Sequence, residues 1–343
     1  MRLRHRYHHP PVSVFVVAEA GLLHDGSLGN AIRMAEVAAA AGADAIKFQL
    51  HDPAAEMVRD APSPTHFSAE SRWAYFERTA FTDEQWARLK ESCEAAKIEF
   101  LCSAFSVEAL ERLERIGVRR HKIPSGEVTN LELVRRAAEA RPVILSSGMS
   151  STAELDAAVG EAGSRQSDVT ILQCTSQYPC PPERAGLNVL AELRERYGKP
   201  VGFSDHTVGP YAAFAAVALG AVAIEKHFTL SKEMYGSDAR FAAEPHELRE
   251  LVEGIRAIEK MIASPVDKDD LETLRGVKEV YEKSVVSAVD IPAGTEIARE
   301  ALRVKKPGTG IPAARLHEVV GRRARTDIAA DQVLSRSDVD WDS

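Results

Sequence analysis

The chain lacks any apolar run of about 18 residues, so its sequence predicts no membrane-spanning helix. It also lacks an excess of basic charge, because 51 Asp and Glu residues outnumber 43 Lys and Arg residues. The resulting net charge of −8 argues against nucleic acid or an anionic membrane as the main partner, since both favour a basic face. The start of the chain, residues 1–10, is basic and His-rich, but the apolar stretch after it is short and contains Glu19. No signal peptide is therefore expected.

Cysteine is scarce, and its spacing fits neither a zinc site nor a disulfide framework. Only four cysteines occur, Cys93, Cys102, Cys174 and Cys180. A reducing cytoplasm is therefore the predicted location. Cys102 and Cys174 follow apolar runs, and we expect them to be buried small side chains rather than groups that face a pocket.

What the sequence does contain is eight short apolar runs that each end in polar side chains, and nearly every run is followed by a helix-like stretch. Eight alternating strands and helices predict an α/β fold, a (β/α)8 TIM barrel. In such a barrel the carboxyl ends of all strands meet on one face, where active sites form. The polar residues at the eight ends are Glu19; Lys47 and Gln49; Ser103; Ser125 and Glu127; Ser146 and Ser147; Gln173 and Thr175; Ser204, Asp205 and His206; and Glu225, Lys226 and His227.

The length of 343 residues accommodates a barrel of roughly 250 residues and one smaller module. We expect the barrel at residues 1–263, a polar linker or connecting helix at 264–283, and a small β-rich domain at 284–343. Within the small domain residues 290–297 resemble residues 327–334, and this echo suggests internal pseudo-symmetry. Helices are predicted at residues 27–41, 82–93, 107–116, 131–140, 152–162, 187–197, 211–218 and 245–261, and a long insertion at 52–80 is expected to shape a substrate pocket.

Two histidines at strand ends predict a metal site. His206 and His227 follow neighbouring predicted strands at equivalent positions. Adjacent strands lie about 4.8 Å apart, so both imidazoles can reach one divalent cation. Two protein ligands leave open positions for water or substrate. The alternative is that either imidazole caps a neighbouring backbone group.

Two lysines, Lys47 and Lys122, lie in buried strands, where an unpaired charge would be costly. With the strand-end serines they form a ring of donors suited to phosphate and carboxylate, although some of these serines could instead cap helix N-termini. Glu19 and Glu127 could position water or move a proton. The alternative for either carboxylate is a structural ion pair with Lys47 or Lys122.

Several ordered segments resemble the N-acetylneuraminate (sialic acid) synthase family, whose members carry a C-terminal antifreeze-like (SAF) domain. The resemblance runs from about residue 14 to the C-terminus. The segments that carry it are residues 18–21 with 24–27, 122–127, 144–149, 174–179, 203–207, 225–229 and, in the small domain, 304–310.

This resemblance implies that phosphoenolpyruvate condenses with an N-acylated amino sugar, N-acetylmannosamine or a relative, to give a nine-carbon 2-keto-3-deoxy sugar acid and phosphate. It also implies that His206 and His227 hold Mn²⁺, with Mg²⁺ or Co²⁺ as alternatives, to polarise the sugar aldehyde. Glu19 and Glu127 would handle water and protons. The residues that match the phosphoenolpyruvate site are Lys47, Ser103, Lys122, Ser125, Ser147, Thr175, Ser176 and Ser204, and those that match the sugar site are Gln49, Tyr178, Asp238 and Lys306.

In the family the C-terminal domain of one subunit covers the barrel mouth of the other, which implies a domain-swapped homodimer. Lys306 stands where many members carry Arg, whose planar fork makes paired hydrogen bonds that Lys cannot make. Leu23 replaces a usual Asn before His24, and Ser176 replaces an Asn common in the phosphate site. These departures leave the reaction type in place and the identity of the sugar open.

The nearest alternative is a legionaminate or pseudaminate synthase that acts on a diacetamido-trideoxyhexose, a choice that loops 52–80 and 235–240 would decide. Synthases of seven- and eight-carbon sugar acids lack the appended domain. A metal-dependent amidohydrolase would show His-x-His after the first strand, where this chain has Glu19-Ala20-Gly21. A non-catalytic carbohydrate-binding or ice-binding protein would not need lysines and carboxylates at the strand ends.

Overall fold

The computed structural model describes residues 13–62, 70–163 and 168–342. The basic, His-rich start, residues 1–10, and part of the predicted insertion at 52–80 lie outside the described residues. The chain divides into two compact units, residues 1–264 and residues 265–343. Each unit is described by itself.

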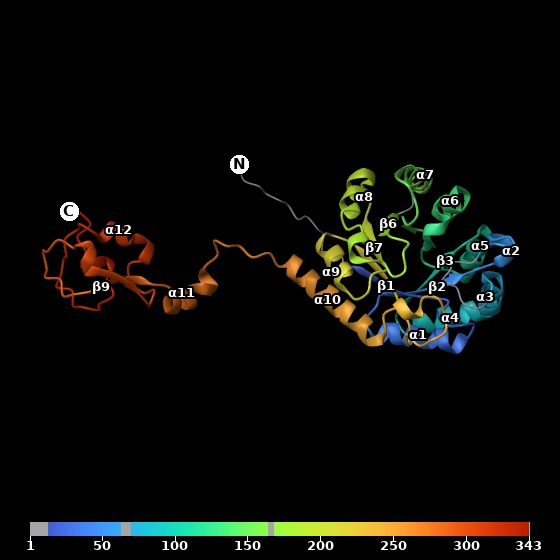
Figure 1. The fold of residues 1–343 in the computed structure, drawn as a ribbon, viewed down its shortest axis with the longest axis horizontal. Coiled ribbons are helices and arrows are strands. Elements are labelled where there is room, and N and C mark those ends of the chain that lie inside the picture. The colour runs from blue at the N-terminus through green and yellow to red at the C-terminus, as the bar shows by residue number, and fades with distance from the viewer. Residues whose placement is uncertain (1–12, 63–69, 164–167, 343) are drawn as a thin grey trace. The chain divides into compact units, whose positions relative to one another are not determined.

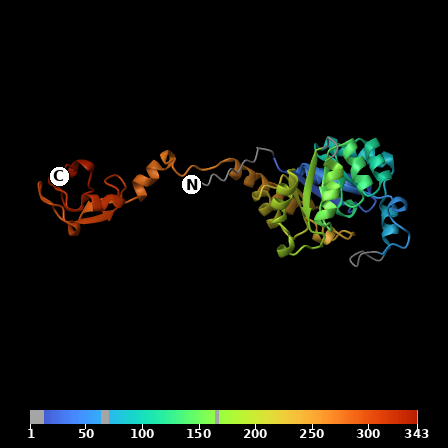
Figure 2. The same ribbon diagram turned by 90° about the horizontal axis from the view of Figure 1, so that it is seen from above.

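The first unit is built around a closed barrel of eight parallel strands in sequential order, which confirms the predicted TIM barrel. Figures 1 and 2 show the helices on the outer side of these strands. The strands are β1 (Phe15–Gly21), β2 (Ala45–Leu50), β3 (Glu99–Ala104), β4 (His121–Ile123), β5 (Val143–Ser146), β6 (Val169–Cys174), β7 (Val201–Asp205) and β8 (Ala223–His227).

Ten α-helices among the described residues of the first unit connect and cover these strands. Three of them match the predicted ranges residue for residue, namely Val107–Ile116, Leu131–Ala140 and Tyr211–Ala218. No helix within the described residues has the length and apolarity that a membrane span needs. The helices are α1 (Leu28–Ala40), α2 (Pro53–Glu56), α3 (Arg72–Thr79), α4 (Asp83–Ala95), α5 (Val107–Ile116), α6 (Leu131–Ala140), α7 (Thr152–Gly163), α8 (Val189–Tyr197), α9 (Tyr211–Ala218) and α10 (Pro245–Ala263), with 3-10 turns η1 (Ser125–Glu127), η2 (Pro182–Arg184) and η3 (Ala239–Phe241).

Local sequence signals explain where these helices begin and end. The Thr82 hydroxyl accepts from the Gln85 amide while the Gln85 side chain accepts from the Thr82 amide, so the predicted capping box starts α4. Gly42 follows α1 with a φ of 89°, a left-handed conformation that glycine adopts at little cost. The long insertion after β2 contains two helices, α2 and α3.

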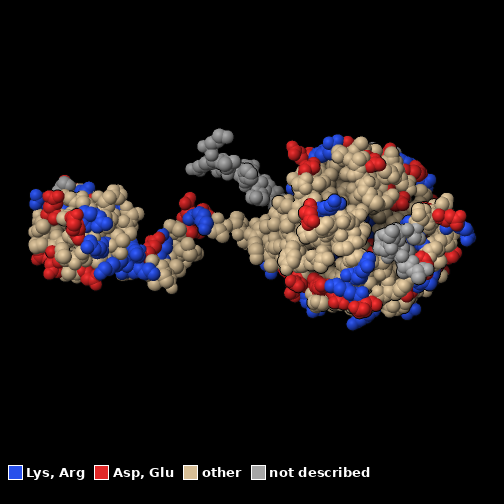
Figure 3. Space-filling model, viewed as in Figure 1, with Lys and Arg blue, Asp and Glu red and all other residues tan. Residues whose placement is uncertain are grey.

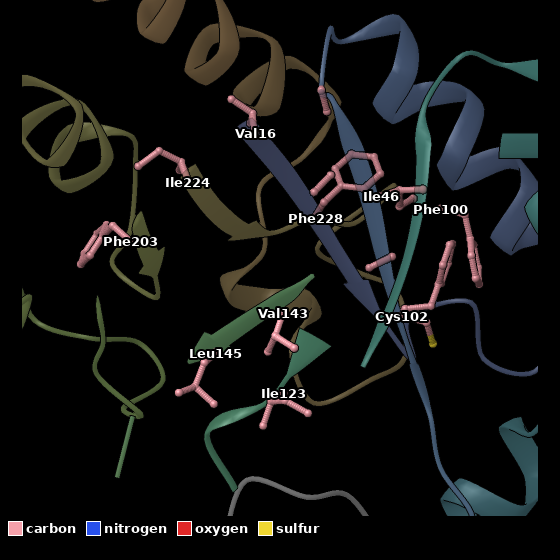
Figure 4. Close-up of a cluster of buried hydrophobic side chains, with 14 of the residues drawn as sticks. Val16, Ile46, Phe100, Cys102, Ile123, Val143, Leu145, Phe203, Ile224 and Phe228 are labelled. Carbon is pink, nitrogen blue, oxygen red and sulfur yellow. The ribbon is translucent and has the colours of Figure 1, made fainter. Parts of the chain in front are cut away.

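The alternation of side chains along each strand produces two apolar layers. Outward side chains such as Val16, Ile46 and Phe203 pack against the helices in the main core (Figure 4). Inward side chains fill the barrel and form a separate cluster. Gly202 occupies the β7 position of this inner layer, where an added Cβ would lie 2.6 Å from the Ala223 carbonyl. The inner cluster consists of Val17, Ala45, Leu101, Ile144, Leu172 and Ala223.

The second unit is a small β-rich fold with its own apolar core, as predicted for a SAF domain. The echo between residues 290–297 and 327–334 appears in it as reciprocal contacts. Asp290 accepts from the Ala330 amide and Asp327 accepts from the Ala293 amide, at 2.6 and 2.7 Å. Its elements are η4 (Glu272–Leu274), α11 (Arg275–Tyr281), β9 (Ser284–Ser287), η5 (Arg299–Ala301), β10 (Leu302–Lys305), η6 (Ala313–Arg315), α12 (Leu316–Val319) and η7 (Arg336–Asp338).

On the visible face of the barrel unit, Lys and Arg alternate with Asp and Glu rather than gathering in one basic field (Figure 3). Many of these charges are paired along helices, such as Arg135 with Glu132 and Glu139 on α6. The charged groups that matter for chemistry lie inside the barrel instead.

Candidate active site

A layer of buried polar side chains lies directly above the apolar floor of the barrel. Each strand position two residues beyond the floor again points inward, because side chains alternate along a strand. Glu19 thus follows Val17, Lys47 follows Ala45, and Glu225 follows Ala223. The same step gives a ring of inward polar groups drawn from almost every strand. Its members, together with Lys122 of β4, are Glu19, Lys47, Ser103, Ser146, Cys174, Ser204 and Glu225, all buried.

Four charged members of this layer form one cluster of alternating sign. Lys47 Nζ lies 2.7 Å from Glu19 Oε2 and 3.7 Å from Glu225 Oε1. Lys122 Nζ also lies 3.7 Å from Glu225 Oε1. The predicted alternative for Glu19, an ion pair with Lys47, is therefore present in the structure. The cluster brings Lys47 and Lys122, predicted from separate strands, to one carboxylate.

Hydroxyl groups complete the contacts of this charged cluster. Lys47 donates to Ser103 Oγ at 3.2 Å, and Lys122 donates to Ser146 Oγ at 2.6 Å. Ser204 Oγ donates to Glu225 Oε1 at 3.2 Å. Ser103 and Ser204 therefore bind the charged groups of the cluster.

Burial and mutual attraction set the ionisation of the cluster. Burial is the largest influence on Glu19 and raises its pKa, although Lys47 opposes the shift. For Glu225 the two lysines outweigh burial and lower the pKa. For Lys47 the two carboxylates outweigh burial and raise the pKa, whereas burial dominates for Lys122 and lowers its pKa. The cluster thus contains one firmly ionised carboxylate and one carboxyl group, Glu19, that is easier to protonate.

A second group of predicted residues converges on the backbone of Gly148. A Cβ at Gly148 would lie 2.3 Å from Ser176 Oγ and 2.6 Å from Ser125 Oγ, so any larger residue would displace these two hydroxyl groups. The Ser176 hydroxyl is buried and has no hydrogen-bond partner among the described residues. Ser176 borders a cleft of about 1050 Å³ that is lined by residues of α7 and α8. The predicted anion-binding serines of β4 and β6 therefore meet at one place.

Two of the predicted phosphoenolpyruvate residues are engaged elsewhere. Ser147 Oγ donates to Gln173 Oε1 and accepts from the Cys174 amide, each at 3.2 Å. Thr175 Oγ1 donates to the Arg184 carbonyl at 2.8 Å. Both residues line the cleft, but neither contacts the lysines directly in the described structure.

The two predicted metal ligands lie side by side at the mouth of the barrel. His206 directly follows β7 and His227 ends β8, and their ring centroids are 5.4 Å apart. His206 Nδ1 lies 2.8 Å from the Thr175 carbonyl, so this nitrogen donates and the other can accept. His227 Nδ1 is buried without a hydrogen-bond partner among the described residues. Burial lowers the pKa of His227 to about 4, which keeps the ring neutral near pH 7.

Three predicted sugar-site residues surround the same mouth. Gln49 Nε2 donates to Glu19 Oε1 at 2.7 Å. The Tyr178 ring centroid lies 4.2 Å from that of His206, and Asp238 Oδ2 lies 3.7 Å from His227 Nδ1. These contacts place the three side chains next to Glu19 and the two histidines.

Two further predicted residues belong to other elements of the chain. Glu127 belongs to η1, where it accepts from Asn130 at 3.0 Å, and burial raises its pKa. Lys306 belongs to the second unit, where its ammonium group lies 5.0 Å from the centre of the Tyr281 ring. Their predicted roles stay predictions.

Comparison with known proteins assigns the chain to a family. Residues 34–267 match the model of the NeuB family, and residues 282–340 match the SAF domain. The chain belongs to the NeuB family. An N,N'-diacetyllegionaminic acid synthase from Campylobacter jejuni is 33% identical over 93% of this chain and 98% of the relative. The human N-acetylneuraminate-9-phosphate synthase is 33% identical over 95% of this chain and 92% of the relative.

Solved structures agree with this assignment. The crystal structure of an N-acetylneuraminic acid (sialic acid) synthetase from Leptospira borgpetersenii, in complex with citrate, is 34% identical. It covers 78% of this chain and 91% of its own, with a TM-score of 0.69. The resemblance predicted from the short motifs is thus confirmed. The two relatives and the solved structure named above are synthases or synthetases of nonulosonic acids by name.

The NeuB barrel contains three inward residues that belong to the sequence motifs but were given no role in the predicted site. Glu225 holds both buried lysines, Ser146 binds Lys122, and Cys174 Sγ lies 3.9 Å from His206 Nδ1. Cys174 therefore faces the site, against the expectation of a purely structural role, whereas Cys102 lies in the outer core as expected. A step of two residues back from His227, or two residues on from the barrel floor, leads to Glu225 and predicts that it points inward.

The two histidines fit the divalent ion expected of a NeuB enzyme. The buried Nδ1 of His227 makes no hydrogen bond among the described residues, and metal binding needs the neutral imidazole that its lowered pKa provides. Within the described residues no cluster of three or more His, Cys, Asp and Glu side chains is arranged for a metal. The protein thus offers two ligands and leaves further positions to water or substrate.

Proposed function

We propose that the chain condenses phosphoenolpyruvate with an N-acylated amino sugar, N-acetylmannosamine or a relative, to form a nine-carbon 2-keto-3-deoxy sugar acid and phosphate. The observation that carries this proposal is the buried Glu19–Lys47–Glu225–Lys122 cluster together with two strand-end histidines whose ring centroids lie 5.4 Å apart. The synthases of sialic and legionaminic acids among the relatives support it.

Lys47 and Lys122 are suited to bind the anionic phosphoenolpyruvate. Two ammonium groups in a water-poor site attract phosphate and carboxylate strongly, because the local dielectric is low. The hydroxyl groups of Ser125 and Ser176 around Gly148 add neutral donors for the same anion. We assign Ser103, Ser147, Thr175 and Ser204 to the walls of this anion site.

Glu19 is suited to move a proton during the reaction. One C–C bond forms between the enol carbon and the sugar aldehyde, water adds to the cationic carbon, and the C–O bond to phosphate then breaks, with no change of redox state. A carboxyl group with a raised pKa can accept the proton of that water and return it. Glu127, whose pKa is also raised by burial, is the second candidate for this task.

The proposed metal site consists of His206 and His227, with Mn²⁺ as the expected ion and Mg²⁺ or Co²⁺ as alternatives. Such an ion supplies Lewis-acid polarisation of the sugar aldehyde. Gln49, Tyr178 and Asp238 would orient the sugar, since all three lie next to these histidines or Glu19.

We also propose that the enzyme is a domain-swapped homodimer that works in the cytoplasm. Residues 264–283 would serve as the linker, and Lys306 of the SAF domain would reach the sugar in the site of the other subunit. The match of residues 282–340 to the SAF domain supports this part of the proposal.

The second candidate acceptor is the diacetamido-trideoxyhexose used for legionaminate or pseudaminate. Two relatives, from Campylobacter jejuni and Legionella pneumophila, are N,N'-diacetyllegionaminic acid synthases at 33% and 32% identity. Both acceptors would react with phosphoenolpyruvate bound in the same part of the site.

Phosphate release tests the proposal. The purified chain is incubated with Mn²⁺, phosphoenolpyruvate and each member of a panel of N-acylated hexosamines, including both acceptors. We expect release that requires an acceptor and that disappears in K122M, which retains the volume of the side chain without its charge. Absence of release with every acceptor, or equal release without any sugar, contradicts the proposed function.

A further inference from the structure

A hydrogen-bonded relay extends from the predicted catalytic carboxylate Glu19 into the insertion after β2. Glu19 Oε1 accepts from Gln49 Nε2 at 2.7 Å. Gln49 Oε1 lies 3.2 Å from His51 Nε2, and His51 Nδ1 lies 2.9 Å from Glu56 Oε1 at the end of α2. The relay therefore consists of Glu19, Gln49, His51 and Glu56. Its outer half has no role in the function proposed above.

His51 is a polar side chain that is buried in an aromatic environment. Its ring lies between two phenylalanine rings, with centroid distances of 3.7 Å to Phe76 and 4.0 Å to Phe105. The side chains of His51 and Glu56 are each only 5% exposed. Stacking would serve equally well with an apolar ring, so the two ring nitrogens are the distinctive contribution of histidine here.

The hydrogen-bonding capacity of each group fixes the direction of the relay. While Glu19 is ionised its carboxylate only accepts, so the Gln49 amide nitrogen faces Glu19 and the amide oxygen faces His51. His51 Nε2 must therefore carry a proton and donate it. One further proton, held between Nδ1 and Glu56, completes the relay. A rotated amide would set oxygen against the Glu19 carboxylate and nitrogen against the N–H of His51.

We propose that His51, held by Glu56, is a positioning residue that locks the side-chain amide of Gln49 in the orientation required by Glu19 and by the acceptor sugar. This inference rests on the proposed function, because Gln49 and Glu19 belong to that site. The locked amide keeps one N–H and one oxygen lone pair for the acceptor. The insertion that contains Glu56 and Phe76 thereby controls how the sugar is held.

Two variants separate the hydrogen bond from the packing. H51F keeps an aromatic ring between Phe76 and Phe105 but removes both ring nitrogens. H51Q loses the stacking but returns a donor near the position of Nε2. We expect H51F to lower the melting temperature, because the buried Glu56 carboxylate loses its partner, and to keep the wild-type KM for phosphoenolpyruvate. We expect kcat/KM for the sugar to fall about tenfold, the loss of one oriented hydrogen bond. H51Q should recover part of that loss.

The role of Glu56 is tested by a double-mutant cycle. E56A should lower kcat/KM for the sugar in the wild-type background and have no further effect in H51F, because Glu56 acts through His51. Additive losses would contradict the relay. So would an H51F enzyme with wild-type sugar kinetics, or an H51Q enzyme no better than H51F.

A crystal structure of H51F tests the inference without turnover. We expect the Gln49 side chain to leave its position near Glu19 or to adopt more than one rotamer. A single unchanged rotamer at hydrogen-bonding distance from Glu19 overturns the positioning role. The two failures differ, because a wild-type chain that releases no phosphate contradicts the proposed function, whereas the rotamer of Gln49 reports on His51 alone.

Discussion

The replacement of Glu225 by glutamine tests the charged cluster most directly. Glu225 Oε1 lies 3.7 Å from both Lys47 Nζ and Lys122 Nζ, deep in the barrel. E225Q preserves the shape of the side chain but leaves two ammonium groups with only the carboxyl of Glu19 nearby. We expect lower stability of the free enzyme and a stronger stabilising effect of bound anions.

The size of this effect follows from the geometry. Each of the two Coulomb attractions amounts to about 4 kcal/mol at an effective dielectric constant near 20. Desolvation offsets part of this, and removal of one partner from a buried pair costs about 3–5 kcal/mol. The low end applies here, because Lys47 keeps Glu19 as a second partner at 2.7 Å. A loss of about 3 kcal/mol corresponds to a decrease in melting temperature of roughly 10 °C.

Thermal unfolding in the presence of a chelator, with and without phosphoenolpyruvate, measures both effects. The matched control is E132Q, which removes an exposed carboxylate that pairs with Arg135 and Arg136 and should cost less than about 1 kcal/mol. Phosphoenolpyruvate should raise the melting temperature of E225Q more than that of the wild type, because it replaces the missing negative charge. Equal melting temperatures for E225Q and E132Q would refute the reasoning.

Three further predictions concern the metal ligands, acid stability and the second unit. H206A and H227A should each abolish metal-dependent phosphate release with unchanged circular dichroism, and near-normal activity in both would remove the metal role. Burial lowers the pKa of His24 to about 4 from about 6.5 in the unfolded chain, so its contribution to stability is complete above pH 6.5 and is lost as the pH falls toward 4. The free energy of unfolding, measured in denaturant, should therefore fall over this pH window by about 3 kcal/mol less in H24N than in the wild type. An equal fall in the two proteins would contradict this. Deletion of residues 284–343 should leave a folded barrel with weakened sugar affinity, whereas unchanged KM for the sugar would rule out a covering role for the SAF domain.

Strand positions and helix boundaries could be predicted because each depends on a local pattern. The ends of the apolar runs located Glu19, Lys47 and Lys122, and the Thr82 signal located the start of α4. It was harder to predict which side chains point into the barrel, because Glu225, Lys226 and His227 are three polar residues in a row. Alternation points Glu225 into the site, while Lys226 points away and binds Asp205 at 2.7 Å.

The contacts between loops could not be predicted, since they depend on the three-dimensional course of the insertion. Lys47, Gln49 and His51 share one face by the same alternation, but nothing in the sequence shows that Glu56 turns back to meet His51. Likewise, Arg78 on α3 binds Asp25 of the β1 loop at 2.7 Å, a contact between residues distant in sequence. Long-range contacts of this kind follow only from the folded chain.

The residues proposed to bind phosphoenolpyruvate and those proposed to bind the sugar belong to different loops, and this separation has an evolutionary consequence. The serines around Gly148 belong to loops after β4, β5 and β6, whereas Gln49, His51 and Glu56 belong to β2 and the segment after it. Selection could therefore remodel one arc of the rim to suit a new carbohydrate while the opposite arc stays unchanged. Exchange of residues 52–80 between homologues offers a direct route to engineered enzymes for unnatural nine-carbon sugars.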